Sequence, residues 1–238
     1  MDVADPDVAQ VSTQPANQKR SEPRGGSNSF FQSLLFPLSV TQTHRDALRY
    51  LSHSLSAPII ATPVFVVLAL LESATILSAI LSVVFATIVP IVAIIGFARS
   101  QGLDYDIPEK RSRARPFGIA ILSYLAGFAV LVMIRAPILL GGLMLAYFIN
   151  TSAFFLITLT WKISVHAAGI TGPLSFLVFK LGPAWGLLYL LVIPVGLIRV
   201  RLGQHTSLQV LAGAVLSAGL TWTQIIFLVP FISNMIAI

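Results

Sequence analysis

The stretch that decides the fold is PIIATPVFVVLALLESATILSAILSVVFATIVPIVAIIGFA, residues 58–98, in which Glu72 is the one charged residue. About 20 apolar residues cross a bilayer as a helix, so this run is long enough for two crossings joined near Glu72. The whole chain of 238 residues has the same character, since 56% of its residues are hydrophobic and 10% are charged. Soluble proteins have about 25% charged residues. The sequence therefore predicts an all-α fold, a polytopic transmembrane helical bundle of about six to seven spans.

After this stretch, long apolar runs alternate with short polar segments. The first polar segment, at 99–115, contains five of the fifteen basic residues and three of the nine acidic residues. The others lie at 162–166 and 199–209. The apolar runs are 58–98, 116–161, 167–198 and 208–228. Each of the first three is predicted to cross the membrane twice, and the last is predicted to cross it once.

The chain before residue 58 is predicted to hold two further parts. Residues 1–29 are polar and contain the basic cluster Lys19, Arg20 and Arg24, with almost no large apolar side chain to bury, which predicts a disordered N-terminal tail. In 30–57, leucines such as Leu48 and Leu51 recur at helical spacing beside basic residues, which predicts an interfacial amphipathic segment. The transmembrane domain is then 58–238.

The number of crossings between the polar segments matters for function. Two spans are predicted between 99–115 and 162–166, and two more between 162–166 and 199–209. An even number of crossings returns the chain to the same membrane face. We therefore expect the three polar segments to converge on one site at one membrane surface.

The residue types in these segments favour phosphate chemistry. The chain has no cysteine, which excludes disulfides and thiol nucleophiles. His166 and His205 lie in polar segments with several arginines, a lysine and a serine but scarcely a carboxylate. Guanidinium groups neutralise phosphate oxygens, while one imidazole can attack phosphorus and the other can protonate the leaving oxygen. The net charge of +6 in such an apolar chain indicates topology and lipid contacts, and no nucleic-acid partner is predicted.

Three short motifs resemble the signatures of the type 2 phosphatidic acid phosphatase and haloperoxidase superfamily. Arg-Pro at 115–116 resembles the end of the first signature, and Ser-Val-His at 164–166 resembles the Ser-Gly-His of the second. The run RVRLGQHTSLQVLAG at 199–213 has the Arg-x5-His-x3-Asp spacing of the third, with Gln in place of Asp. The order of the motifs extends the likeness over roughly 103–220.

The resemblance implies a membrane lipid phosphatase that uses a phosphohistidine and needs neither metal nor other cofactor. By this resemblance His205 is the nucleophile, His166 is the acid for the leaving group, and Gln209 replaces the Asp that orients the nucleophile. The signature's lysine is replaced by Pro108, so Lys110 or Arg111 would have to substitute for it. The predicted phosphate-binding residues are Arg199, Arg115, Ser164, Lys110, Arg111 and Lys162. The implied substrate is a lipid phosphate or an isoprenoid diphosphate.

Two other functions remain open. Because Gln209 supplies no negative charge to the neighbouring imidazole, the protein could be a non-catalytic phospholipid-head-binding or transport protein with a degenerate phosphatase site. Asp104 and Asp106, followed by Arg-Pro, resemble the acidic stretch of membrane prenyltransferases. No acidic residue occurs after Glu109, however, to form the second motif that holds magnesium diphosphate in that family.

The distribution of basic residues predicts which face carries the site. Seven basic residues of the polar segments, at 110, 111, 113, 115, 162, 199 and 201, are candidates for phosphate binding, and the other eight are divided between the two faces. The face of the N-terminus and the polar segments has Lys19, Arg20, Arg24, Arg45, Arg49 and Arg99, whereas the opposite face has Arg135 and Lys180. The positive-inside rule therefore predicts a multi-pass protein whose site faces the cytoplasm.

Overall fold

The computed structural model describes residues 47, 48, 50, 51, 57–100 and 114–236. Residues 57–236 belong to one compact unit. The predicted N-terminal tail, most of the interfacial segment and the predicted phosphate ligands Lys110 and Arg111 lie outside the described residues. Within the described part every regular element is a helix, which confirms the all-α prediction.

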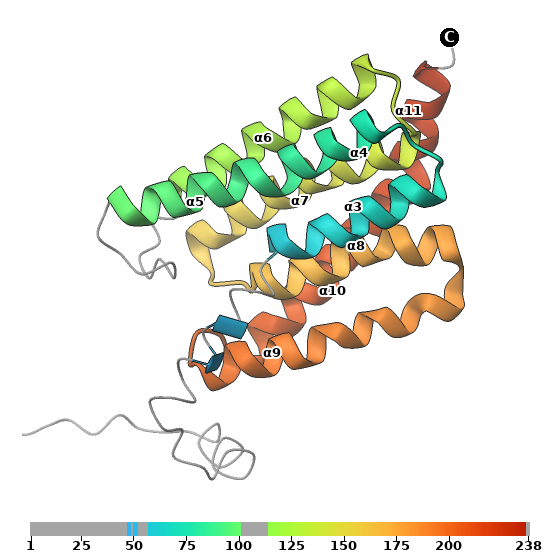
Figure 1. Ribbon diagram of the computed structural model, residues 1–238. Helices are drawn as coiled ribbons and strands as arrows, with labels where there is room; N and C mark the ends of the chain where they lie inside the picture. The colour runs from blue at the N-terminus through green and yellow to red at the C-terminus, as the bar shows by residue number, and fades with distance from the viewer. Residues whose placement is uncertain (1–46, 49, 52–56, 101–113, 237–238) are drawn as a thin grey trace, which may run out of the picture. The chain divides into compact units, whose positions relative to one another are not determined.

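The described helices form seven continuous rods (Figure 1). In chain order they are α3 (Ala57–Leu71); α4 (Ile76–Val83), η1 (Val84–Ile88) and α5 (Val89–Ser100); α6 (Ala114–Met133); α7 (Ile138–Thr160); α8 (Val165–Leu181); η2 (Pro183–Leu191) and α9 (Val192–Arg201); and α10 (Ser207–Thr223), η3 (Gln224–Leu228) and α11 (Val229–Ile236). Five of the rods are long and apolar enough to cross a membrane, and α3 and α8 are shorter apolar helices.

Two rods contain a π-helical segment in front of a proline. The segment η1 ends two residues before Pro90, and η3 ends two residues before Pro230. A proline inside a helix cannot donate to the carbonyl one turn earlier and its ring crowds that carbonyl. The wider π turn relieves this crowding, so each rod continues through its proline.

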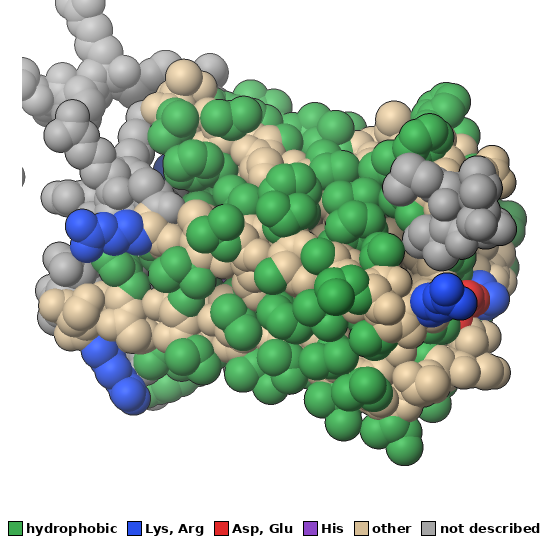
Figure 2. Space-filling view, turned by 90° about the horizontal axis from the view of Figure 1, so that it is seen from above, with side chains coloured by type: hydrophobic (Ala, Val, Ile, Leu, Met, Phe, Trp, Pro, Cys, Tyr) green, Lys and Arg blue, Asp and Glu red, His purple; other side chains and the backbone are tan. Residues whose placement is uncertain are grey.

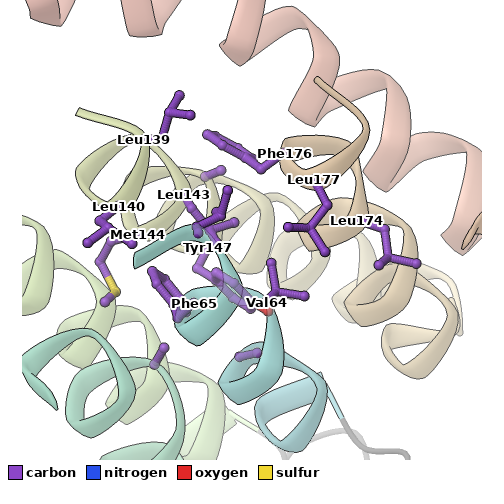
Figure 3. Packing of buried hydrophobic residues seen from close by; sticks show 14 of the residues in the cluster. Val64, Phe65, Leu139, Leu140, Leu143, Met144, Tyr147, Leu174, Phe176 and Leu177 are labelled. Atoms are coloured by element: carbon purple, nitrogen blue, oxygen red, sulfur yellow. The ribbon is translucent and has the colours of Figure 1, made fainter. Parts of the chain in front are cut away.

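The helix α8 is the centre of the bundle. Its residues from Ala167 to Val178 are all buried, and it packs against α3, α7, α9 and α10. The main core contains large side chains from α3, α7 and α8, which meet as shown in Figure 3. Hydroxyl groups join α8 to α10, since Thr171 donates to the Ala214 carbonyl at 2.8 Å and Ser217 donates to the Ala168 carbonyl at 2.9 Å. The α8–α10 pair is thus held together by hydrogen bonds between the helices.

Charged side chains lie at the two ends of the rods. In the face shown in Figure 2, hydrophobic side chains cover the middle and the visible charges gather at both ends. At one end Lys180, at the end of α8, forms an ion pair with Glu72, which follows α3. The described cations of the other end are Arg99, Arg115, Lys162, Arg199 and Arg201. A band of apolar surface between two charged ends is the arrangement that a bilayer requires.

Candidate functional site

The described parts of the three polar segments lie at the same end of the bundle (Figure 1), as the even number of predicted crossings requires. Figure 1 shows that α6 and α8 begin at this end, that α7 and α9 end there and that α10 begins there. The turn at 161–164 connects α7 to α8, and the turn at 202–206 connects α9 to α10. The part of the first polar segment that the structure describes is 99–100 and 114–115.

A backbone hydrogen bond joins the second signature to the third. The N–H of Ser164 donates to the carbonyl oxygen of Gln209 at 3.2 Å. Gly213, one turn further along α10, lies so close to Ser164 that a Cβ at 213 would overlap the Ser164 carbonyl oxygen. The start of α8 and the start of α10 are therefore held in one fixed register.

A small apolar cluster brings the first signature to the same place. Phe117, two residues after Arg115, packs against the cluster that contains Ile163 and Ala168, and Ala212 of α10 packs against the same cluster. This cluster is separate from the main core. It fixes the first turn of α6 next to the other two signatures, although Arg115 itself is exposed.

The turn before α10 is built so that His205 is buried at the site. Gly203 has a φ of +67°, which favours glycine, and it reverses the chain after α9. The N–H groups of Gln204 and His205 both donate to the Arg199 carbonyl, at 3.0 and 3.3 Å. The imidazole that follows is buried, with 9% of its surface exposed. Arg199 and His205 are thus connected directly through the backbone.

Gln209 holds the imidazole of His205. Its Oε1 lies 3.3 Å from His205 Nδ1 and also accepts the N–H of Thr206 at 3.1 Å. Because the Thr206 N–H needs an acceptor, the amide must turn its oxygen, not its NH2 group, toward these atoms. An amide oxygen carries no proton, so Nδ1 must be the donor and the lone pair of His205 is on Nε2. Gln209 therefore selects the imidazole tautomer that has a nucleophilic Nε2.

The same glutamine is part of a helix cap. The Thr206 hydroxyl accepts the Gln209 N–H at 3.3 Å, and the Gln209 side chain accepts the Thr206 N–H, which together form a capping box at the start of α10. The Thr-x-x-Gln spacing is a recognised sequence signal for such a cap. Sequence reasoning singled out Gln209 for its place in the signature and missed Thr206.

The remaining predicted ligands differ in exposure. Arg199 is 4% exposed at the last turn of α9, whereas Arg115 is exposed and Lys162 and His166 are half-buried. A cation at a helix C-terminus is stabilised by the helix dipole, which favours Arg199 where it lies. Ser164 is fully buried and caps α8, because its Oγ accepts the Ala167 N–H at 3.4 Å.

A cavity of about 170 Å³ lies directly beyond the signatures, and no motif in the sequence marks it. Its walls come from α3, α5, α6, α7, α8 and α10. On α8 the lining residues include Val165, Ala168, Gly169, Gly172 and Pro173. This helical spacing describes one face of α8, the face that begins next to His166.

The fold and the site together define a class: a bundle of apolar helices that carries a cationic, histidine-containing site at one end. No protein family, curated protein or solved structure that was compared with the chain matches it. The assignment of a function therefore depends on the geometry of this site and on the resemblance of its motifs.

Proposed function

We propose that this protein is an integral membrane phosphatase that hydrolyses a lipid phosphate or an isoprenoid diphosphate through a phosphohistidine intermediate. The observation that carries the proposal is the contact between His205 Nδ1 and Gln209 Oε1 at 3.3 Å. This contact leaves Nε2 as the nucleophilic atom, and the backbone N–H of His205 donates to the carbonyl of Arg199. A cation close to the nucleophile in the chain supports attack on a phosphate anion.

The reaction has two steps. In the first, the Nε2 lone pair of His205 attacks phosphorus, the bond from phosphorus to the ester oxygen breaks, and His166 gives its proton to that oxygen. In the second, His166, now neutral, takes a proton from water while the water oxygen attacks phosphorus and the bond to Nε2 breaks. The products are the lipid alcohol, or the monophosphate from a diphosphate, and inorganic phosphate. Each histidine returns to its starting protonation state.

The cations of this end supply the charge that the transition state needs. Arg199 is buried, so its guanidinium acts where water screens it least. Arg115 and Lys162 contribute from more exposed positions at the same end. The Ser164 hydroxyl accepts the Ala167 N–H and keeps its own proton, which can be donated to a phosphate oxygen.

Gln209 sets the expected speed of this chemistry. A carboxylate at this position would orient the imidazole and also stabilise the positive charge that develops on it. In serine proteases, replacement of the orienting Asp by an amide lowers kcat by about 10⁴, largely because the wrong tautomer forms. In this protein the Thr206 N–H fixes the amide, so the correct tautomer is kept and the missing charge is the remaining cost.

A phosphate-release assay in EDTA tests the proposal. The full chain in detergent micelles is given phosphatidate, phosphatidylglycerophosphate or polyprenyl diphosphates, with the His205→Ala variant as the control. We expect release of inorganic phosphate by the wild type and none by the variant. Binding without release would instead indicate a non-catalytic lipid-head binder. Magnesium-dependent release of pyrophosphate would indicate a prenyltransferase, and either result would contradict the proposal.

The orientation in the membrane is part of the proposal. The excess of basic residues on the face of the polar segments supports a site on the cytoplasmic side. The substrate would then be taken from the inner leaflet, with its head at the cationic end and its tail among the helices.

A further inference from the structure

The cavity beyond the signatures is long, and two of its lining residues are chain neighbours of proposed site residues. It runs along α8 from Val165 to Pro173, which at about 1.5 Å per residue is roughly 12 Å. Pro116 and Val165 line its near end, and they adjoin Arg115 and His166 in the chain. A chain attached to a phosphate at the site would therefore enter this cavity directly.

The deep end of the cavity is closed by the main core. Leu143, Tyr124 and Tyr147 line it there, and all three are buried core residues. The ring of Tyr147 is tightly held, because it lies 5.2 Å from the ring of Tyr124 and 6.0 Å from that of Phe65. Figure 3 shows Tyr147 between α7 and the residues Val64 and Phe65 of α3. This end cannot lengthen without repacking the core.

Three polar side chains of the cavity wall, those of Asn150, Ser217 and Thr221, are hydrogen-bonded within the protein. Asn150 Nδ2 donates to Thr221 at 2.8 Å, and Asn150 Oδ1 accepts from Gln224 at 2.8 Å. Ser217 donates to the backbone of α8. The Tyr147 hydroxyl is buried, with almost no accessible surface and no hydrogen-bond partner among the described residues. Burial of a polar or charged ligand without new hydrogen bonds is costly, so the cavity favours an apolar occupant.

The size of the cavity limits the occupant. An engineered cavity of about 150 Å³ stays dry and binds benzene, a molecule of six carbons. The 170 Å³ here has room for a similar amount of hydrocarbon. We propose that the cavity binds the first part of a single hydrocarbon tail, about six carbons long, next to the phosphate of the substrate. This inference rests on the proposed phosphatase function and names how the substrate is recognised.

A series of short alkyl phosphates, from ethyl to octyl and below their micelle concentrations, measures this recognition. For the wild type we expect kcat/KM to rise about fourfold for each CH2 that enters the cavity, which corresponds to ~0.8 kcal/mol per CH2. The rise should stop once the cavity is full. A rise that continues through octyl, or none at all, would overturn the proposal.

A matched pair of variants on α6 locates the effect. Ala120 lines the cavity, whereas Ala126 is exposed on the same helix. In Ala120→Leu the rise should stop about three carbons earlier, and in Ala126→Leu it should match the wild type. If Ala120→Leu does not fold, Thr151→Leu fills the cavity from α7 and serves the same purpose. An unchanged chain-length profile in the folded cavity variant would contradict the proposal.

A binding measurement separates failure of the cavity from failure of the phosphatase function. Farnesol has an apolar chain and no phosphate, so it should raise the thermal unfolding temperature of the wild type and of His205→Ala, but not of Ala120→Leu. Stabilisation without any phosphate release would retain the cavity and reject the phosphatase. Phosphate release with equal farnesol stabilisation of both alanine-to-leucine variants would reject the cavity and retain the phosphatase.

Discussion

The backbone N–H of Ser164 donates a 3.2 Å hydrogen bond to the carbonyl oxygen of Gln209. These residues belong to two different signature motifs, and the helices α8, η2 and α9 lie between them in the chain. The bond sets the start of α8 against the start of α10. It therefore determines where His166, in the first turn of α8, stands relative to His205, just before α10.

Substitutions of Gln209 test whether this residue orients His205. Gln209→Glu keeps the length that reaches both His205 Nδ1 and the Thr206 N–H, and it adds a charge that stabilises an imidazolium. We expect it to raise phosphatase kcat. Gln209→Leu removes the acceptor and should lower kcat by up to about 10⁴, the effect of a lost tautomer in serine proteases. The measurement is the steady-state rate of each variant in one detergent.

A cap variant serves as the control for this pair. Thr206→Ala removes the hydroxyl that caps α10 but leaves Gln209 Oε1 in reach of the imidazole. It should cost about 1 kcal/mol of stability and leave kcat within a few-fold of wild type. If Thr206→Ala and Gln209→Leu lower kcat equally, fraying of the helix explains both and Gln209 does not orient His205.

The two histidines should respond differently to the leaving group. His205→Ala should abolish turnover on all substrates, because it removes the nucleophile. His166→Ala should lose about 10² to 10⁴ on an alkyl phosphate, the usual contribution of a general acid, and much less on a nitrophenyl phosphate, whose leaving group needs no proton. Rates for both variants on both substrates check this. Equal losses on the two leaving groups would reject the assigned roles.

Gly213 and Gly219 form a second matched pair, both on α10. A Cβ at 213 would overlap a backbone atom of Ser164, whereas a Cβ at 219 meets nothing within 4 Å. Gly213→Ala should lower stability by about 1–3 kcal/mol and reduce turnover, because the contact cannot relax without moving α8 away from α10. Gly219→Ala should keep or raise the stability, since alanine is the better helix former. Thermal unfolding in detergent compares the two, and equal unfolding temperatures would show that the close approach is unimportant.

Cysteine labelling tests the proposed orientation. The native chain has no cysteine, so single cysteines report without background. With the site in the cytoplasm, Ser112→Cys should not react with an impermeant maleimide in intact cells. Ala184→Cys, which is exposed at the start of η2 at the opposite end, should react. The reverse pattern would place the site on the outer face.

The sequence by itself determined the number and the type of the helices. Hydrophobic length is a local property, so the runs between Glu72, Arg135, Lys180 and the polar segments predicted the seven rods. The same counting placed the polar segments at one end. Local spacing also predicted that the side chains of His205 and Gln209 lie close together, because residues four apart share a helix face.

Only the tertiary structure decided how these rods meet. Glu72, which the sequence places where two crossings join, forms an ion pair with Lys180, more than a hundred residues later in the chain. The contact of Gly213 with Ser164 and the cavity between six helices likewise depend on packing between distant segments. Apolar periodicity shows that a helix is buried, but in a membrane all faces are apolar and the pattern does not specify the neighbour. Close packing of small residues and interhelical hydrogen bonds make that choice, and they are settled only when the chain is folded.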